Sequence, residues 1–422
     1  MSKVNDPSNK SWISIAANSD FSIQNIPFGI SLVNNEYKVV SAIGEMVIDI
    51  SSLNKLGYLK SIDIPQQVLE NKFLNDLISL GKSKTNALRE RIADLMNVNN
   101  TELQNNDSHK NSVLIDSTKV QMCLPVRIEN YTDFYSSIEH ATNVGTMFRD
   151  PANALLPNWK HIPIGYHGRA SSIIISGTNF HRPKGQTKGP NDEIPKFGAT
   201  QQLDFELEMG FIVGKETNLG DSVTTDKADE YIFGMVVFND WSARDIQSWE
   251  YVPLGPFLAK NFASSVSPWV VTLEALEPFR TEGYVQEPKV LSYLEYKGNK
   301  NIDINLQVFI QGEKQDETLV STSNYKYMYW NMNQQLAHHT VNGCNIKVAD
   351  LYASGTISGK SEDSYGSMLE LTWRGTKPLK LKDGTERKFI NDNDTVIMRG
   401  YCEKNGVRVG FGEVKGKVLA AN

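Results

Sequence analysis

The alternation of side chains between Leu203 and Phe211 restricts the fold of this chain more than any other feature. In the segment LDFELEMGF, apolar residues take every second position, and the acids Asp204, Glu206 and Glu208 stand between them. Successive side chains of a β-strand point to opposite faces, so this pattern predicts a strand with one apolar and one acidic face. The acidic face has two interpretations: it is covered by solvent, or it binds a cation.

Further strand-like runs follow Val120, and helical periodicity is sparse there. The predicted strands are Gln202–Val213, Tyr231–Asn239, Ile302–Gln311, Ser367–Trp373 and Thr395–Arg399. A large β-rich region with few helices is the simplest account of this pattern. We therefore predict a fold that is mainly β, of the α+β class.

The first hundred residues form a separate unit in this interpretation. Tyr37–Ile43 and Glu45–Ile50 read as strands, and Phe73–Leu80 and Ala87–Met96 read as helices. Residues 97–118 are rich in Asn, Asp, Ser and Lys, which is typical either of a linker or of a surface loop inside one domain. We predict two domains, residues 1–119 and 120–422.

Composition narrows the class of protein. Among 422 residues, 43 Lys and Arg stand against 49 Asp and Glu, and the net charge of −6 argues against nucleic acid or an anionic membrane as partner. The N-terminus has no apolar export core, and no run approaches the ~20 apolar residues of a membrane span. Three widely spaced cysteines favour a reducing compartment. We expect a cytoplasmic protein.

Four acids are candidate ligands of a cation. Glu206 and Glu208 on one strand face lie roughly 7 Å apart, Asp240 ends the apolar run that begins at Tyr231, and Asp133 precedes them in the chain. Asp240 has an alternative role as a helix N-cap. If the four acids converge, a hard cation relieves their repulsion, and oxygen ligands favour calcium, magnesium or manganese over zinc.

Two histidines are candidate general bases. His140 lies seven residues after Asp133, and a helix beginning within 136–141 brings it near the same cleft. His167, in the run GYHGR, competes for this role. For either residue the alternative is a purely structural histidine, which is the commoner case.

Donor groups follow Asp240 closely. Arg244, Gln247, Tyr251 and Lys260 suit a carboxylate substrate or an oxyanion intermediate, although an ordinary polar helix over Ser242–Glu250 explains some of them equally well. The run SGTISG at 354–359 has the form of a small anion-binding turn, without the spacing of a nucleotide P-loop.

Long motifs of this chain resemble the fumarylacetoacetase family, in that family's order and spacing. A looser match, DFSIQNIPFG at 20–29, extends the resemblance to nearly the whole chain. The motifs are DFYSSIEHATNVGTMFRD at 133–150, PNWKHIPIGYHGRASSI at 157–173, LDFELEMGFIVG at 203–214, IFGMVVFNDWSARDIQSWEYVPLGPFLAKNF at 232–262, VSPWVV at 266–271, SGTISG at 354–359 and GSMLELTW at 366–373.

The resemblance implies a fold and an activity. The implied fold is a small SH3-like β-barrel with short helices and a linker over 1–119, followed by a large mixed β-roll catalytic domain over 120–422, in a homodimer. The implied activity is hydrolysis of the carbon–carbon bond of the diketo acid 4-fumarylacetoacetate to fumarate and acetoacetate. This reaction is the last step of tyrosine and phenylalanine catabolism.

The resemblance also assigns site residues by matching positions. His140 matches the general base and Glu370 the carboxylate that orients it, although an acid inside a strand-like run gives little local signal. Asp133, Glu206, Glu208 and Asp240 match calcium ligands. Asp240, Lys260 and Ser264 match a magnesium site. The family has Thr at the position of Ser264. The expected ligand from Lys260 is its backbone carbonyl. Arg244, Gln247 and Lys260 match the oxyanion-stabilising groups. Tyr135, Arg149, Tyr166, Gln247, Tyr251 and Thr356 match substrate contacts.

Two other functions stay open at this level. A related enzyme acting as decarboxylase, hydratase or isomerase on another keto acid would use the same metal to stabilise the same enolate. A metal-dependent acid-binding protein without turnover is the non-enzymatic alternative. The His140–Glu370 pair and the long N-terminal unit favour the hydrolase.

Overall fold

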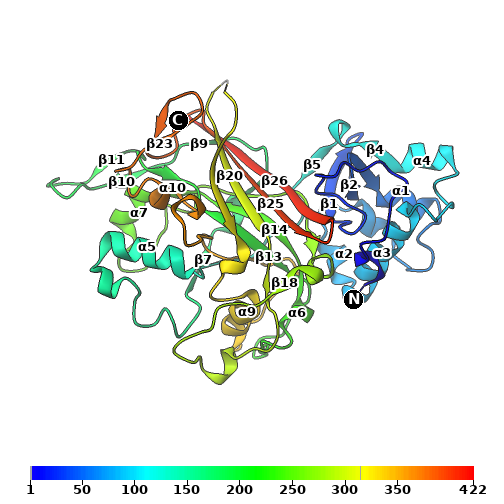
Figure 1. The fold of residues 1–422 in the computed structure, drawn as a ribbon, viewed down its shortest axis with the longest axis horizontal. Coiled ribbons are helices and arrows are strands. Elements are labelled where there is room, and N and C mark those ends of the chain that lie inside the picture. Colours follow the sequence, from blue (N-terminus) through cyan, green and yellow to red (C-terminus); the bar gives the residue numbers. More distant parts are fainter. Residues whose placement is uncertain (1, 314) are drawn as a thin grey trace.

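A computed structural model describes residues 2–313 and 315–422 (Figure 1). It combines several β-sheets with mostly short helices, which confirms the prediction of a β-rich α+β chain at this level. The N-terminal unit, blue to cyan, lies at one end of the molecule, and the β10–β11 hairpin lies at the opposite end. No helix in the described ranges is long and apolar enough to cross a membrane.

The N-terminal unit is built on a five-stranded antiparallel sheet in the order β4-β3-β2-β1-β5. Its strands are β1 (Phe28–Val33), β2 (Glu36–Ile43), β3 (Met46–Asp49), β4 (Leu114–Asp116) and β5 (Gln121–Cys123), and its helices are α1 (Ile50–Lys55), α2 (Asn75–Ser79), α3 (Lys82–Met96) and α4 (Asp107–Val113). The predicted apolar face of α3 is buried through Leu88, Ile92, Leu95 and Met96. Both predicted strands of this unit are present as β2 and β3.

The polar segment 97–118 is part of this unit and not a free linker. Asn106 caps α4 by accepting a hydrogen bond from the backbone of His109, and β4 pairs with β3. Polar composition was misleading here because a short helix and an edge strand need few apolar residues. The sheet also continues beyond residue 119, since β5 pairs with β1.

The central sheet carries the candidate site. Its main order is β7-β6-β22-β13-β14-β16-β8, with β17 also paired to β14. Only the β22–β6 and β16–β8 pairs of this sheet are parallel among the described strands. The strands are β6 (Tyr131–Phe134), β7 (Gly165–Gly168), β8 (Ile173–Ile175), β13 (Leu207–Val213), β14 (Ile232–Asp240), β16 (Ser264–Val266), β17 (Val271–Thr272) and β22 (Leu351–Ala353).

A second sheet in the order β21-β20-β25-β26-β9 packs on one face of the central sheet. Its strands are β9 (Phe180–His181), β20 (Asn305–Gln311), β21 (Thr318–Asn324), β25 (Thr395–Lys404) and β26 (Val407–Leu419). The main core lies between the two sheets and includes Leu207, Met209 and Phe211, the apolar face predicted from the alternation. In Figure 1 the long β25–β26 pair runs from this core toward the N-terminal unit.

Strand β14 is buried on both faces, as its continuous apolar run predicts. Met235 and Val237 enter the core between the sheets, whereas Val236 and Phe238 enter the core shared with the N-terminal unit. Asp240 stands two residues after Phe238, so it lies on the second of these faces. The acids therefore sit where the core shared with the N-terminal unit ends.

The remaining elements are short and connect or flank the sheets. The strands are β10 (Lys184–Thr187), β11 (Lys196–Ala199), β12 (Leu203–Asp204), β15 (Ser242–Ala243), β18 (Arg280–Thr281), β19 (Asn301–Ile302), β23 (Leu379–Lys380) and β24 (Glu386–Arg387). The helices are α5 (Ile138–Phe148), α6 (Ala228–Tyr231), α7 (Arg244–Glu250), α8 (Leu273–Leu276), α9 (Met332–Thr340) and α10 (Met368–Leu371).

Three strand predictions need correction. The predicted strand Ile302–Gln311 is interrupted between β19 and β20. The segment Ser367–Trp373 forms the helix α10 and the turn after it, because Ser367 caps the helix by accepting a hydrogen bond from the backbone N–H of Glu370. The predicted strand Gln202–Val213 is interrupted between β12 and β13. Phe205 and Glu206 lie in the interruption, and Glu206 forms an isolated bridge with Ser367.

Candidate active site

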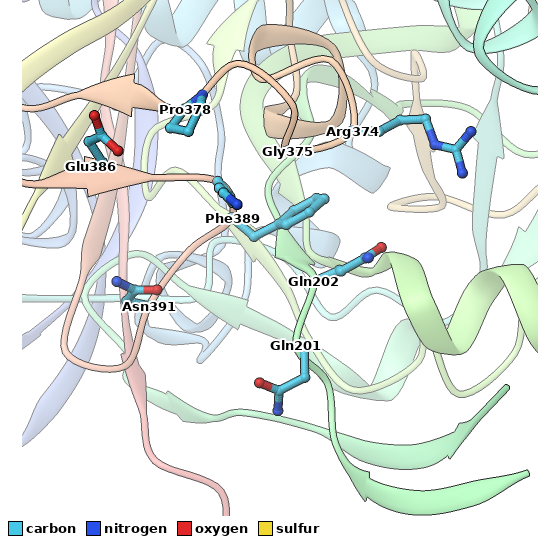
Figure 2. A pocket seen from close by; sticks show the side chains of 9 residues that line it. Gln201, Gln202, Arg374, Gly375, Pro378, Glu386, Phe389 and Asn391 are labelled. Carbon is cyan, nitrogen blue, oxygen red and sulfur yellow. The ribbon is translucent and has the colours of Figure 1, made fainter. Parts of the chain in front are cut away.

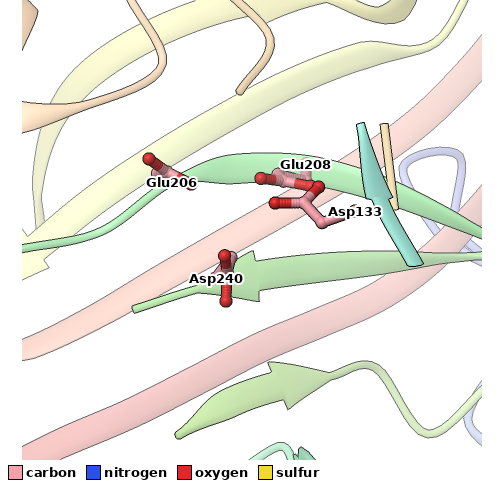
Figure 3. A group of neighbouring side chains, drawn as sticks. All are labelled: Asp133, Glu206, Glu208 and Asp240. Carbon is pink, nitrogen blue, oxygen red and sulfur yellow. The ribbon is translucent and has the colours of Figure 1, made fainter. Parts of the chain in front are cut away.

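Four buried carboxylates converge at one end of the strands of the central sheet (Figure 3). Asp133 comes from β6, Glu206 from the link into β13, Glu208 from β13 and Asp240 from the end of β14. One oxygen of each lies within 4.8 Å of the corresponding oxygens of the other three. The acidic strand face is therefore not covered by solvent, and the cation-binding interpretation of these four acids is the one that the geometry favours.

Asp204 alternates with Glu206 and Glu208 in sequence but does not join this cluster. Its carboxylate accepts hydrogen bonds from the Nε of Arg244 at 2.8 Å and from the backbone of α10. The interruption between β12 and β13 separates Asp204 from the other two acids. Strict alternation in the sequence did not predict this difference.

Lys260 and Ser264 lie against the cluster. The Lys260 ammonium donates to Glu206 Oε2 at 2.5 Å and to Asp240 Oδ2 at 2.7 Å. Ser264 Oγ donates to Asp240 Oδ1 at 2.8 Å. A protonated ammonium has no lone pair for a metal, so the Lys260 side chain acts as a neighbouring cation and not as a ligand.

The electrostatics of the cluster show an excess of negative charge. Burial and the charge of Asp240 raise the pKa of Asp133 well above its usual value, and burial with the charge of Asp133 does the same for the pKa of Glu208. Burial also disfavours ionised Glu206, but Lys260 and Arg244 outweigh it and hold the pKa of this carboxyl below its usual value. A divalent cation would relieve the repulsion that remains.

The donor set fits a hard cation. Asp133 Oδ1 and Glu208 Oε1 are buried and have no hydrogen-bond partner within the described parts of the chain. Glu208 Oε2 is already held by the backbone N–H of Gly355 at 3.0 Å, which orients the free oxygen. Four carboxylates without sulfur or imidazole are the ligands that calcium, magnesium and manganese prefer.

His140 forms a buried pair with Glu370. Helix α5 begins after Ser137, whose hydroxyl accepts the His140 N–H, so the predicted helix start is confirmed. His140 Nδ1 lies 2.7 Å from Glu370 Oε2. His140 also lies near enough to Glu206 to contribute to the lowered pKa of that carboxyl. The competitor His167 is exposed on β7, and its ring lies tilted against that of His339 with centroids 5.8 Å apart.

Glu370 is held by three further donors. Asn143 donates to Oε1 at 2.9 Å, Ser358 donates to both oxygens at 2.9 Å, and Ser367 donates to Oε2 at 2.8 Å. Burial opposes ionisation, but His140, Asn143 and Ser367 lower the pKa of Glu370 overall. Glu370 is therefore an ionised acceptor that fixes the ring of His140.

A local signal for Glu370 does exist in the sequence. Ser367 precedes it by three residues, and Ser-x-x-Glu is the pattern of a helix N-terminal capping box. Read in this way, the run predicts a helix start and places Glu370 on its first turn. The apolar residues Met368, Leu369 and Leu371 favoured a strand instead, because a single turn of helix is too short to show a helical period.

The predicted donor residues divide into two groups. Arg244 Nη1 contacts Glu206 Oε1 at 2.8 Å and donates to Gln247 Oε1 at 3.2 Å, whereas its Nη2 is buried without a partner among the described residues. The Tyr166 hydroxyl donates to Asp240 Oδ2 at 3.3 Å. These groups point at the cluster and include an unused donor.

Other predicted substrate contacts are less closely tied to the cluster. The Tyr135 ring packs edge-on against His140 with centroids 5.2 Å apart, and Thr356 is buried beside Gly355. Gly355 has a φ of +75°, and a Cβ there would lie 2.1 Å from the carbonyl oxygen of Phe134. Arg149 donates to the carbonyl of Ala154. Tyr251 is 53% exposed in the loop after α7.

A separate cavity of about 500 Å³ lies beside the β23–β24 hairpin (Figure 2). Its lining includes Gln201, Gln202, Arg374, Lys388 and Phe389. Among the residues described, none of the four clustered acids and neither His140 nor Glu370 lines it. Because it lacks their chemistry, this cavity is not the candidate site.

Comparison with known families covers both parts of the chain. The family described as fumarylacetoacetate (FAA) hydrolase C-terminal matches residues 129–419, and the family described as fumarylacetoacetase N-terminal matches residues 24–125. The first match contains the four acids of the carboxylate cluster and both residues of the His140–Glu370 pair.

Full-length relatives agree with these matches. A fumarylacetoacetase of Dictyostelium discoideum is 50% identical over 420 residues, with 98% of each chain covered. The fumarylacetoacetase of Homo sapiens is 48% identical over 414 residues, covering 97% of this chain and 99% of that protein. A solved fumarylacetoacetate hydrolase structure from Exiguobacterium antarcticum has a TM-score of 0.54 at 15% identity, covering 94% and 99% of the two chains, and supports the fold alone. The chain belongs to the fumarylacetoacetate hydrolase family.

Proposed function

We propose that this protein hydrolyses fumarylacetoacetate to fumarate and acetoacetate, using a divalent cation and a water molecule activated by His140. The observation that carries the proposal is the buried carboxylate cluster beside a histidine whose Nδ1 is held by Glu370. A hard-cation site next to an oriented base suits a hydrolase acting on a diketo acid. The activity in the printed names of the full-length relatives agrees with this arrangement.

Asp133, Glu206, Glu208 and Asp240 would hold the cation. When bound there, a divalent cation supplies Lewis-acid polarisation of the substrate oxygens and offsets the charge of an enolate product. Lys260 and Tyr166 reach the same carboxylates from the protein side and limit their freedom to move. The site thus combines four carboxylates with hydrogen-bond donors that hold them in place.

His140 removes a proton from water, and the resulting hydroxide attacks the carbonyl carbon on the fumaryl side of the bond to be cleaved. Glu370 holds the Nδ1 proton, so Nε2 is the free base of the neutral ring. The ionised carboxylate also stabilises the imidazolium that forms when Nε2 takes the proton. Both effects require the 2.7 Å contact between the two side chains.

Arg244 and Lys260 stabilise the tetrahedral oxyanion. The buried Nη2 of Arg244 is the donor that no described residue uses, and an oxyanion supplies the missing acceptor. Gln247 fixes the guanidinium from the other side through Arg244 Nη1. Removal of one such donor typically costs about 10²–10³-fold in kcat.

Collapse of the tetrahedral intermediate breaks the carbon–carbon bond. The fumaryl fragment leaves as the acid, and the acetoacetate fragment leaves as a carbanion in its enolate form. Lys260 is fully charged because the carboxylates of Asp240 and Glu206 outweigh its burial and raise its pKa. It donates a proton to the carbanion and is reprotonated by the proton that His140 took from water.

The proposal has finer parts that rest on the family resemblance. They include calcium at the four-carboxylate site, with manganese as a further candidate, and a second cation, magnesium, near Asp240, the carbonyl of Lys260 and Ser264. Substrate contacts through Tyr135, Arg149, Tyr166, Gln247, Tyr251 and Thr356 also belong here. The 2.8 Å contact between Ser264 and Asp240 supports a hydroxyl at the second site.

The same resemblance supports four statements about the whole protein. They are an SH3-like barrel domain, predicted over 1–119 although its strand β5 reaches Cys123, with a β-roll catalytic domain after it, a homodimer, a cytoplasmic location, and a place at the end of tyrosine and phenylalanine catabolism. The five-stranded N-terminal sheet is compatible with a small barrel.

A turnover assay tests the proposal. Purified protein is incubated with fumarylacetoacetate and each divalent metal, and loss of diketone absorbance is followed together with the two products. We expect equal amounts of fumarate and acetoacetate. Conversion to an isomer, loss of carbon dioxide, addition of water without cleavage, or binding without turnover would each replace the hydrolase with one of the alternatives.

A further inference from the structure

Asp204 links the two halves of the catalytic machinery, although it is not part of the carboxylate cluster. It is fully buried at the end of β12, and all of its described hydrogen bonds go to segments that carry proposed catalytic groups. Oδ2 accepts from Arg244 Nε at 2.8 Å. Oδ1 accepts from the backbone N–H of Met368 at 2.6 Å, and Oδ2 also accepts from that of Leu369 at 2.9 Å.

The first link fixes the direction of the Arg244 guanidinium. With Nε on Asp204 and Nη1 on Glu206 and Gln247, the planar guanidinium cannot rotate, and Nη2 keeps one direction. A guanidinium bound through several of its donors is preorganised, so its reorganisation free energy is small when an oxyanion forms. Asp204 thus determines where the unused donor of Arg244 points.

The second link fixes the start of α10. The first N–H groups of a helix have no partners within the helix, and here Asp204 binds those of Met368 and Leu369 while Ser367 binds that of Glu370. Glu370 is the third residue of this helix, and it orients His140. Asp204 therefore holds the base pair in place through the backbone.

We propose that Asp204 is a positioning residue that sets the placement of the Arg244 donor relative to the His140–Glu370 base. This inference rests on the proposed hydrolase function and extends it to a residue outside the cation site. Water attacks the carbon, and the oxyanion forms on the oxygen, of the same carbonyl group. The base and the Arg244 donor therefore have to be positioned together. A displacement of about 1 Å in such a constellation can cost on the order of 10²-fold in rate.

The chain offers a matched control for a purely structural ion pair. Asp394 is also buried, and it accepts from Arg387 Nε at 2.7 Å, from Arg387 Nη2 at 2.9 Å and from the backbone N–H of Asn391 at 2.9 Å. It has the same chemistry as the Asp204–Arg244 pair, but it lies among the C-terminal strands. Asp394→Asn therefore reports the cost of weakening a buried Asp–Arg pair in which neither side chain contacts a proposed catalytic group.

The experiment measures kcat, KM and thermal unfolding of the full chain for Asp204→Asn and Asp394→Asn. We expect comparable falls in melting temperature for both variants. Only Asp204→Asn should lose kcat, by about 10–100-fold, because misplacement acts on the chemical step. Asp204→Glu keeps the charge and moves it by one methylene, so it should lose kcat as well and serves as a second variant if Asp204→Asn does not fold.

A double-mutant cycle separates action through Arg244 from independent effects. Asp204→Asn is combined with Arg244→Lys, which keeps a positive charge but lacks the fork of donors. We expect Arg244→Lys to lower kcat much less in the Asp204→Asn background than in the unaltered chain, since the effects of coupled residues are not additive. An additive cycle contradicts positioning through Arg244.

The outcomes distinguish this inference from the proposed function. Suppose that the unaltered chain turns over the substrate. An unchanged kcat in a folded Asp204 variant, or an equal loss of kcat in Asp394→Asn, then overturns only the role of Asp204. Failure of the unaltered chain to consume fumarylacetoacetate overturns the hydrolase function itself.

Discussion

The imidazole Nδ1 of His140 lies 2.7 Å from the Oε2 of Glu370, although 230 residues separate them in the chain. His140 stands on the first turn of α5 and Glu370 on the first turn of α10, and each turn begins at a serine cap, Ser137 and Ser367. The same Ser367 hydroxyl also donates to Glu370. Two local helix starts therefore position one catalytic pair.

His140→Ala should abolish most turnover while the fold is retained. Loss of a general base typically costs about 10²–10⁴-fold in kcat. His167→Ala is the informative comparison, because it removes the competing histidine, which is exposed and lies against His339. We expect His167→Ala to keep kcat within about threefold of the unaltered chain, far from the loss expected for a base. Equal losses in both variants, measured by steady-state kinetics, would contradict the assignment.

Glu208→Gln should weaken cation binding and yet stabilise the cation-free protein near pH 7. It removes one ligand charge, so we expect calcium or magnesium affinity to fall by roughly tenfold or more in isothermal titration. It also replaces a buried carboxyl, whose pKa is raised by burial and by Asp133, with an amide that cannot ionise, so repulsion in the empty cluster decreases. The melting temperature of the cation-free variant should therefore exceed that of the unaltered chain.

Asp350→Asn is the control for this prediction. Asp350 is buried and has a pKa raised by burial, but it lies near Asn130 and Lys347 instead of the cluster. Cation affinity should stay unchanged in this variant. If it falls as in Glu208→Gln, the carboxylate cluster is not the binding site.

Lys260→Met should lower kcat and tighten cation binding at the same time. Its ammonium lies 2.7 Å from Asp240 and competes with a metal for that carboxylate, so its removal leaves the cluster more negative. A ligand role through the backbone carbonyl of residue 260 would survive the substitution. Loss of an oxyanion donor should cost about 10²–10³-fold in kcat.

Titration calorimetry and kinetics on the same preparation test both effects of Lys260. Lys347→Met is the control, because Lys347 is half exposed and its nearest carboxylate, that of Glu216, is 4.0 Å away. Weaker cation binding in Lys260→Met would mean that the side chain supports the metal directly, contrary to the geometry.

His339→Gln should reduce the loss of stability in acid. Burial, together with the charges of His167 and His338, lowers the pKa of His339 from 6.5 to about 4. The folded state therefore binds fewer protons than the unfolded state between these values. The stability that neutral His339 contributes is complete above pH 6.5 and is lost as the pH falls through 6.5 toward 4.

Urea unfolding at pH 7 and pH 4.5 measures this effect. The fall in unfolding free energy between the two pH values should be smaller in His339→Gln by on the order of 1 kcal/mol. His181→Gln is the control, since it replaces an exposed histidine by the same substitution. Equal slopes in His339→Gln and the unaltered chain would contradict the prediction.

The local patterns that predicted structure correctly are those in which one physical preference dominates. Alternation from Leu203 to Phe211 predicted the core face of β13, and the apolar run before Asp240 predicted a strand buried on both sides. The prediction was wrong at Ser367–Trp373, where one turn of helix is too short to show a period. Of the two interpretations of 97–118, the structure agrees with a segment inside one domain, because a capped helix and an edge strand need little apolar surface.

Residue order alone supplied the residue types, the prediction that Glu206 and Glu208 point the same way, and the similarity to a family. Long-range contacts of the fold bring Asp133 and Asp240 to those two acids, place Asp204 on Arg244, and place Glu370 beside His140. The physical reason is that strand period and capping act within a few residues. Convergence across the central sheet depends on the pairing of β6, β22, β13 and β14, which no local pattern encodes.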